Sequence, residues 1–238
     1  MYCWLKKHLD PICPLFAIVP LVSCFVFNMI IYNGTMVLCS DWHHYDLTTC
    51  LEDAVPLIPE WMYIYWGCFV FWIINYIMIG RINRENKASF YRFIITDMSS
   101  RIVCAFFFIF FPTANTRPDV PIEGLSTWLL NFLYQMDQPT NLFPSIHCLV
   151  SWLSFIGIRK SNKVPFWYKT ASCVMALLVV LSTQFTKQHF WIDAVAGISL
   201  AEILFFINNR INAYRYVERF FGWINQKLFH LFKGELCE

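Results

Sequence analysis

The sequence contains few charged residues. Asp, Glu, Lys and Arg together make up 14% of its 238 residues, whereas a soluble globular domain carries about 25%. Hydrophobic residues make up 58% of the chain and aromatic residues 19%. This composition excludes a soluble domain and indicates an integral membrane protein.

Several other features are missing as well. The chain has no internal repeat, no low-complexity tract and no polar stretch long enough to form a soluble appendage. No small-residue cleavage pattern follows the first apolar run, so we do not interpret that run as a signal peptide. Neither a Cys-x-x-Cys pair nor a His-Glu-x-x-His motif occurs, so the most specific signals for a zinc site are missing. We therefore expect one membrane-embedded domain over residues 1–238.

Long apolar stretches make up most of the chain. Six of them emerge, most close to the length of about 20 residues that a bilayer requires. They cover residues 13–32, 59–80, 102–116, 144–158, 168–186 and 190–209. The third and fourth are short, and we expect flanking residues to extend them. The predicted fold class is all-α, a polytopic membrane helical bundle with about six transmembrane helices.

Basic residues divide unequally between the two sides of such a bundle. With six spans, all of the 18 Lys and Arg residues except Arg117 and Lys187 fall on one side, and the excess of positive charge marks that side as cytoplasmic. Arg92 and Arg101 are counted here as part of the loop between the second and third spans. The two exceptions lie on the opposite side, which suggests an anion site there.

Two short motifs lie on the same side as these exceptional cations. The first is Pro144-Ser145-Ile146-His147, and the second runs from Lys187 to Asp193. His189 and Asp193 are four residues apart and share one face of a helix, so the carboxylate can orient an imidazole whose other nitrogen does chemistry. His147 lies within the first turn of a span, where ionisable groups are costly and usually functional. Ser145 and Asp193 could instead be simple helix caps.

A metal site is the main alternative for this set of residues. His189 and Asp193 could be ligands, but no second carboxylate lies near His147 in the sequence, and the ammonium of Lys187 would repel a cation. We therefore expect no metal and no cofactor.

The order of these motifs resembles the type-2 phosphatidic acid phosphatase superfamily. The resemblance rests on Arg117-Pro118, then Pro144-Ser145-Ile146-His147, then His189 with Asp193 four residues later, across six spans. The contexts 141–147 and 182–189 look like the branch close to inositol phosphorylceramide synthases. The motifs cover residues 117–197.

The resemblance implies a role for each residue. His189 would be the nucleophile that accepts the phosphoryl group, and Asp193 would support its ring from the other nitrogen. His147 would protonate the leaving oxygen and then act as a base on the acceptor. Arg117 and Ser145 would hold the phosphoryl oxygens, since phosphoryl transfer requires cations and donors directed at these oxygens.

The chain also departs from the family pattern. Phe110 stands where a Lys is usual, Ile146 where a Gly is usual, and Thr183 where an Arg is usual. Lys187 could replace one of the missing cations. These departures put a broad-specificity phosphatase in doubt and leave open a phosphotransferase.

We therefore expect a lipid phosphatase that acts on a phospholipid or a polyprenyl lipid through a phosphohistidine. The alternatives are a lipid phosphotransferase that passes a phospho-head-group to an alcohol, a lipid transporter and a non-catalytic lipid-binding scaffold. The expected partners are the bilayer and a membrane lipid substrate, with no nucleic acid. The expected location is a bacterial plasma membrane, with the site on the extracytoplasmic face.

Overall fold

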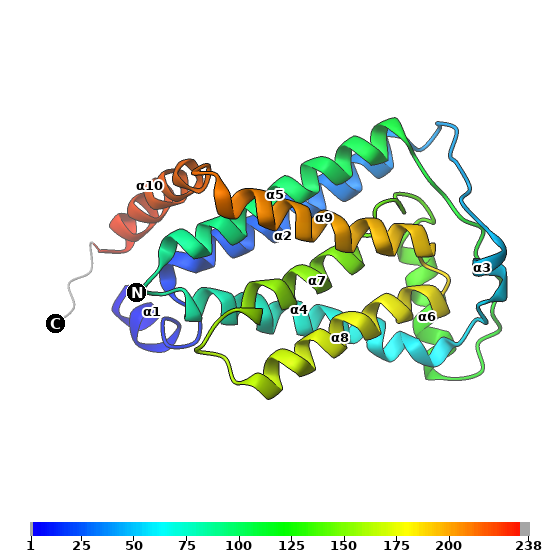
Figure 1. The fold of residues 1–238 in the computed structure, drawn as a ribbon, viewed down its shortest axis with the longest axis horizontal. Helices are drawn as coiled ribbons and strands as arrows, with labels where there is room; N and C mark the ends of the chain where they lie inside the picture. Colours follow the sequence, from blue (N-terminus) through cyan, green and yellow to red (C-terminus); the bar gives the residue numbers. More distant parts are fainter. Residues whose placement is uncertain (1, 234–238) are drawn as a thin grey trace.

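The computed structural model describes residues 2–233, which fold almost entirely into helices (Figure 1). The helices are α1 (Tyr2–His8), α2 (Leu15–Leu38), α3 (Cys50–Ala54), η1 (Pro59–Trp61), α4 (Met62–Ile82), α5 (Lys87–Phe110), α6 (Leu125–Met136), α7 (Ile146–Arg159), α8 (Phe166–Phe185), α9 (Trp191–Arg210) and α10 (Tyr214–Lys233). Within the described range there is no β-strand, only two isolated β-bridges. The all-α prediction is confirmed.

The membrane-spanning character of the bundle follows from its long helices. In residues 2–233, five helical segments are long and apolar enough to cross a membrane, namely α2, η1 with α4, α5, α8 and α9. The remaining predicted span, the fourth at residues 144–158, corresponds to α7, which is apolar but has only 14 residues. The prediction of a polytopic helical bundle is therefore confirmed, with five long helices and the shorter apolar α7 at the six predicted positions.

The predicted limits of the third span were wrong. Helix α5 begins at Lys87 and ends at Phe110, so Arg92 and Arg101 lie inside the helix rather than in a loop. Arg101 is 2% exposed and pairs with Asp97 four residues earlier, with 2.9 Å between Nη2 and Oδ1. The opposite charges of such a pair compensate one another on one helix face. A search for uncharged runs therefore places the start of this span at residue 102, after the true start of the helix at Lys87.

Helix α7 lies at the centre of the bundle and packs against α4, α5, α8 and α9. Its inner residues include Leu149, Leu153 and Ile156, all buried. Gly157 makes the close contact with α4 possible, because a Cβ atom there would lie 2.3 Å from Cδ1 of Ile79. This packing fixes the direction in which the first turn of α7 presents its side chains.

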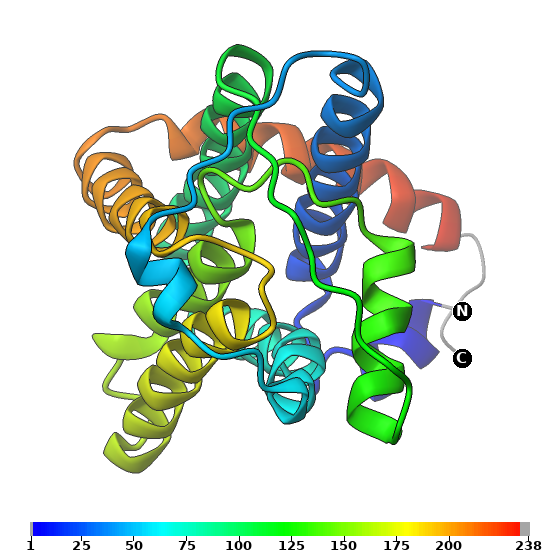
Figure 2. The same cartoon turned by 90° about the vertical axis from the view of Figure 1, so that its right-hand side faces the viewer.

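The two ends of the bundle differ. Figure 1 shows the short helix α3 and helix α6 at one end, and α1 with α10 at the other. Seen from the first end, the connecting segments cross over the ends of the long helices (Figure 2). Both α7 and α9 begin at this first end, which we call the histidine end because it carries His147 and His189.

Candidate active site

The turn that precedes α7 supports the site. Ser145 is the N-cap of α7, and its Oγ accepts a hydrogen bond from the backbone N–H of Cys148 at 3.3 Å. Its own N–H donates to the carbonyl oxygen of Asp193 at 3.0 Å. Helix α9 can come this close because position 197 is glycine, where a Cβ atom would lie 2.5 Å from the Ser145 carbonyl oxygen. Ser145 therefore caps α7, as the alternative interpretation of this residue predicted, and its backbone also contacts the start of α9.

The two histidines face one another. Nε2 of His189 lies 3.4 Å from Nδ1 of His147, although the residues are 42 positions apart. The other nitrogen of His189, Nδ1, lies 3.1 Å from the Leu142 carbonyl oxygen and 3.4 Å from Oδ2 of Asp193. His189 therefore has oxygen acceptors on one side of its ring and the second imidazole on the other.

Asp193 is completely buried, and its carboxylate both caps α9 and lies beside His189. Its Oδ2 accepts a hydrogen bond from the backbone N–H of Phe190 at 2.8 Å, which caps the start of α9. Its Oδ1 has no hydrogen-bond partner among the described residues. A buried carboxylate at a helix N-terminus is stabilised by the helix dipole, and this one lies beside the ring of His189.

Tyr65 was missed by the sequence reasoning. Its hydroxyl lies 2.8 Å from Nε2 of His147, and the two ring centroids are 4.8 Å apart. Both nitrogens of His147 therefore have polar neighbours, Tyr65 on one side and His189 on the other. Tyr65 belongs to the aromatic-rich helix α4, and no spacing in the sequence distinguishes it from the lipid-facing aromatic residues around it.

Arg117 lies beside the loop that carries His189. Its Nη2 donates to Oε1 of Gln188 at 2.9 Å, and its guanidinium also contacts the carboxylate and the carbonyl oxygen of Asp137. The guanidinium lies over the ring of Tyr134, 4.9 Å from its centroid. The side chain is only 7% exposed. The structure thus holds Arg117 one residue away from His189, with several of its donors already engaged.

Lys187 is held by the segment that crosses the histidine end. Its Nζ donates to the carbonyl oxygens of Glu52 and Val55 at 2.7 and 2.5 Å. Its backbone has a φ of 52°, in the left-handed region that L residues other than glycine seldom adopt. The amide of Asn115 donates to the Lys187 carbonyl oxygen at 2.9 Å. The ammonium is therefore bound by backbone oxygens in this structure.

The same crossing segment makes two further contacts, and we call residues 52–58 the strap. The carboxylate of Glu52 accepts a hydrogen bond from the backbone N–H of Trp191 at 3.0 Å, and the N–H of Ile58 donates to the Phe185 carbonyl oxygen at 2.9 Å. Burial acts to raise the pKa of Glu52, but hydrogen bonds from Thr49 and Trp191 outweigh it and hold this pKa below its usual value. The strap is therefore fixed on both sides of the His189 loop.

A groove of about 430 Å³ opens beside His147, between α2, α4, α5 and α7. Its lining is mainly apolar and includes Phe69 and Trp72, whose ring centroids lie 6.4 and 5.7 Å from that of His147. The buried pair of Asp97 and Arg101 forms part of its wall. Two aromatic side chains of the groove therefore lie next to His147, although neither His147 nor His189 is part of its lining.

The predicted residues therefore fall into two groups. His147, His189, Asp193 and Ser145 come together directly, whereas Arg117 and Lys187 are adjacent and engaged by other groups. In residues 2–233, no group of three or more His, Cys, Asp or Glu side chains is arranged to hold a metal ion.

A family model of the PAP2 superfamily matches residues 38–207, which is more than half of the chain and includes the whole site. The chain belongs to the PAP2 superfamily. No match was found among curated proteins or among solved structures. Membership supports a phosphatase-type activity on lipids, and the apolar helices fit an enzyme embedded in the bilayer.

Proposed function

We propose that the chain is a membrane-embedded lipid phosphatase that removes a phosphate or diphosphate group from a phospholipid or a polyprenyl lipid through a phosphohistidine on His189. The observation that carries this proposal is the 3.4 Å contact between Nε2 of His189 and Nδ1 of His147. Two-step phosphoryl transfer requires a nucleophile and, facing it, a second group that can give and take a proton. Here the second nitrogen of the nucleophile also faces a carboxylate.

In the first step, Nε2 of His189 attacks phosphorus and the bond from phosphorus to the lipid oxygen breaks. His147 gives a proton to that oxygen, which leaves as the lipid alcohol. In the second step, His147 takes a proton from water, the water oxygen attacks phosphorus, and the bond from phosphorus to nitrogen breaks. Asp193 supports the positive charge on the His189 ring, and inorganic phosphate is released.

The phosphoryl group must enter between the two rings. A nitrogen attacks from about 3 Å, and the leaving oxygen must lie about 3 Å from its proton donor. A phosphoryl group with both distances satisfied does not fit within the 3.4 Å that separates the two nitrogens, so we expect His147 to move away from His189 when substrate binds. The hydroxyl of Tyr65 can guide that movement, because it holds the far nitrogen of His147.

The phosphoryl oxygens need cations and hydrogen-bond donors. We assign this role to Arg117, Ser145 and Lys187. Gln188 connects Arg117 to the His189 loop, and Ser145 lies at the positive end of α7. Lys187 would have to exchange the carbonyl oxygens of Glu52 and Val55 for the substrate, so its contribution is the one most open to experiment.

The groove beside His147 favours a lipid as the substrate. A hydrocarbon chain lying along Phe69, Trp72 and Ile146 would place its polar head next to His147. A water-soluble phosphate ester would leave these apolar surfaces without a partner.

A second activity shares the first step. If an alcohol takes the place of water in the second step, the enzyme is a phosphotransferase, as the similarity of residues 141–147 and 182–189 to the inositol phosphorylceramide synthase branch suggests. Phe110 and Thr183, which stand where the wider family usually has cations, support this alternative.

The test is phosphate release by the purified full chain from a panel of phospholipids and polyprenyl phosphates. We expect release from at least one lipid, an acid-labile phosphate trapped on the protein, and loss of both in His189→Ala. The exposed His43→Ala serves as the matched control and should keep full activity. Mass analysis of products with and without added alcohols separates a phosphatase from a transferase. A fully active His189→Ala would refute the phosphohistidine.

A further inference from the structure

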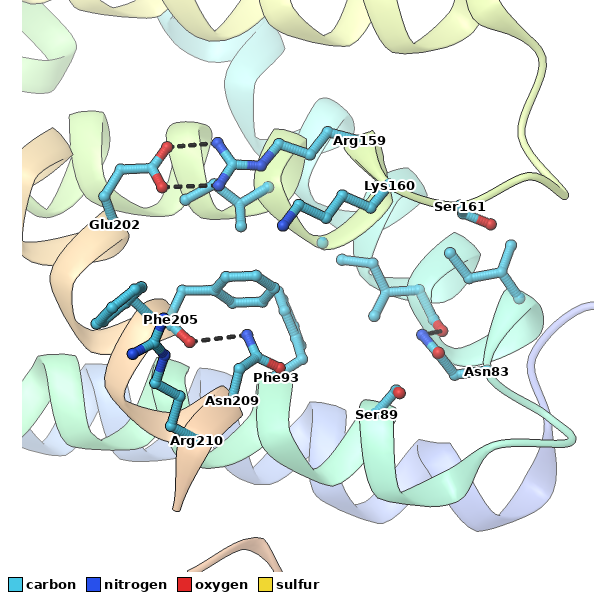
Figure 3. Close-up of a pocket in the computed structure, with 15 residues that line it drawn as sticks. Asn83, Ser89, Phe93, Arg159, Lys160, Ser161, Glu202, Phe205, Asn209 and Arg210 are labelled. Atoms are coloured by element: carbon cyan, nitrogen blue, oxygen red, sulfur yellow. Dashed lines mark hydrogen bonds and ion pairs between the residues drawn. The ribbon is translucent and has the colours of Figure 1, made fainter. Parts of the chain in front are cut away.

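A second cavity lies at the opposite end of the bundle from the histidines. It has a volume of about 540 Å³ and lies among the ends of α4, α7 and α9 and the start of α5 (Figure 3). Arg159 and Lys160, at the end of α7, contribute to its lining. A helix of this length spans about 20 Å, so this cavity is separate from the site around His147.

The charges that line the cavity do not balance. Glu202 forms a two-pronged ion pair with Arg159, with 2.5 and 2.7 Å between the paired atoms, and also accepts a hydrogen bond from Trp152 at 2.9 Å. Its negative charge is therefore already compensated. Among the described residues, no carboxylate lies within ion-pair distance of Lys160 or Arg210. The cavity keeps a net positive charge from these two side chains.

The donors of the cavity lie around one space. Figure 3 shows Lys160 reaching from the end of α7 into the cavity, with Arg159 held against Glu202 beside it and Ser89 on the facing wall. Ser89 and Ser161 add hydroxyl groups, which can donate to the oxygens of an anion. An ammonium, a guanidinium and hydroxyl groups around one space are suited to a phosphate group.

Apart from Asn83 and Asn209, the rest of the lining is apolar and continues toward the outside of the bundle. Phe93 and Ile156 form part of the inner wall. Phe206 also lines the cavity, is 55% exposed, and carries the guanidinium of Arg210 at 3.9 Å from its ring centroid. A ligand held here would thus meet cations next to an exposed apolar surface, which is the chemistry of a phospholipid and not of a free phosphate.

We propose that this cavity binds the head group of an anionic phospholipid from the leaflet that meets this end of the bundle. Its phosphate lies between Lys160 and Arg210, and the first part of its chains lies along Phe206. The site differs from the catalytic one in position and in residues. Cations at the ends of α7 and α9 also compensate the helix dipoles, but that role requires no ligand and predicts no preference among lipids.

The experiment measures the affinity of the purified full chain for dioctanoyl phosphatidylglycerol and dioctanoyl phosphatidylcholine by native mass spectrometry. Each cation near an anionic head group contributes about fivefold to binding. We expect the double variant Lys160→Gln/Arg210→Gln to bind phosphatidylglycerol about tenfold to thirtyfold more weakly than the wild type. The control Lys163→Gln/Lys169→Gln removes two cations that do not line the cavity and should leave this affinity unchanged.

A charge-keeping variant, Lys160→Arg/Arg210→Lys, guards against a folding defect and should retain most of the binding. Three results would each overturn the proposal. The first is an equal loss of phosphatidylglycerol affinity in the Gln cavity variant and the control, and the second is equal binding of both lipids. The third is an equal loss of affinity in the Gln cavity variant and the charge-keeping variant. Displacement of phosphatidylglycerol by inorganic phosphate at the same concentration would overturn it too, because it would assign the cavity to a soluble anion. These outcomes are independent of the reaction at His189, since none of them measures turnover.

Discussion

Replacing Asp193 with asparagine isolates the charge beside His189. Asparagine has nearly the same shape and can still accept the hydrogen bond from the Phe190 N–H, which Asp193 Oδ2 accepts at 2.8 Å, so the start of α9 should persist. The loss is a negative charge 3.4 Å from Nδ1 of His189. At that separation, two unit charges interact by about 4–5 kcal/mol when the effective dielectric constant is about 20.

The expected effect is smaller than this limit. The Leu142 carbonyl oxygen lies 3.1 Å from the same nitrogen and continues to accept its proton, so the orientation of the ring is partly kept. We expect kcat to fall about a hundredfold to a thousandfold, which corresponds to about 3–4 kcal/mol. KM should change much less, because the charge acts on the phosphorylated ring and not on the bound lipid.

The assay is phosphate release from a lipid that the wild-type enzyme accepts, in mixed micelles, with the thermal unfolding temperature measured on the same samples. Asp119→Asn, an exposed acid on the segment between α5 and α6, is the matched control and should behave as the wild type. If folded Asp193→Asn retained a kcat close to that of the wild type, the carboxylate would have no part in supporting His189.

Four other predictions can be checked on the same protein. Tyr65→Phe should lower kcat about tenfold, because His147 loses the hydroxyl 2.8 Å from its Nε2; an unchanged kcat would make Tyr65 a packing residue. Lys187→Ala should lower kcat/KM about tenfold to a thousandfold and Lys187→Arg should retain part of it, whereas a fully active Lys187→Gln would remove Lys187 from phosphate binding. Activity should survive excess EDTA, and its loss with recovery on adding magnesium would revive the metal-site interpretation. A membrane-impermeant thiol reagent should label a cysteine introduced near Asp119 in intact cells but not one near Asn162, and the reverse result would invert the predicted topology.

The general form of the fold could be predicted because hydrophobic length is a local property of the sequence. Each of the long helices α2, α4, α8 and α9 corresponds to one of the predicted apolar stretches. The start of α5 could not be found this way, because Arg101 and Asp97 neutralise one another only after the helix has formed. Their spacing of four residues was the available signal.

The candidate site was predictable only where the residues belong to short motifs. His147, His189 and Asp193 could be placed together from their positions at the starts of two spans, and the structure brings them together. Tyr65 comes from a helix 82 positions away, and only tertiary packing makes it a neighbour of His147. The engagement of Lys187 by the strap was equally hidden, because its partners are backbone carbonyl oxygens, which carry no sequence signature.

The strap has a consequence for how this protein can be handled and inhibited. Surface loops ordinarily accept inserted tags and fusion partners without harm. An insertion between residues 52 and 58 would instead break the contacts to Lys187 and Trp191 and release the His189 loop, so an epitope is better placed near the exposed Asp41. The same contacts offer a route to inhibition by a water-soluble binder. An antibody fragment that binds the strap and displaces it would disturb the His189 loop without entering the bilayer.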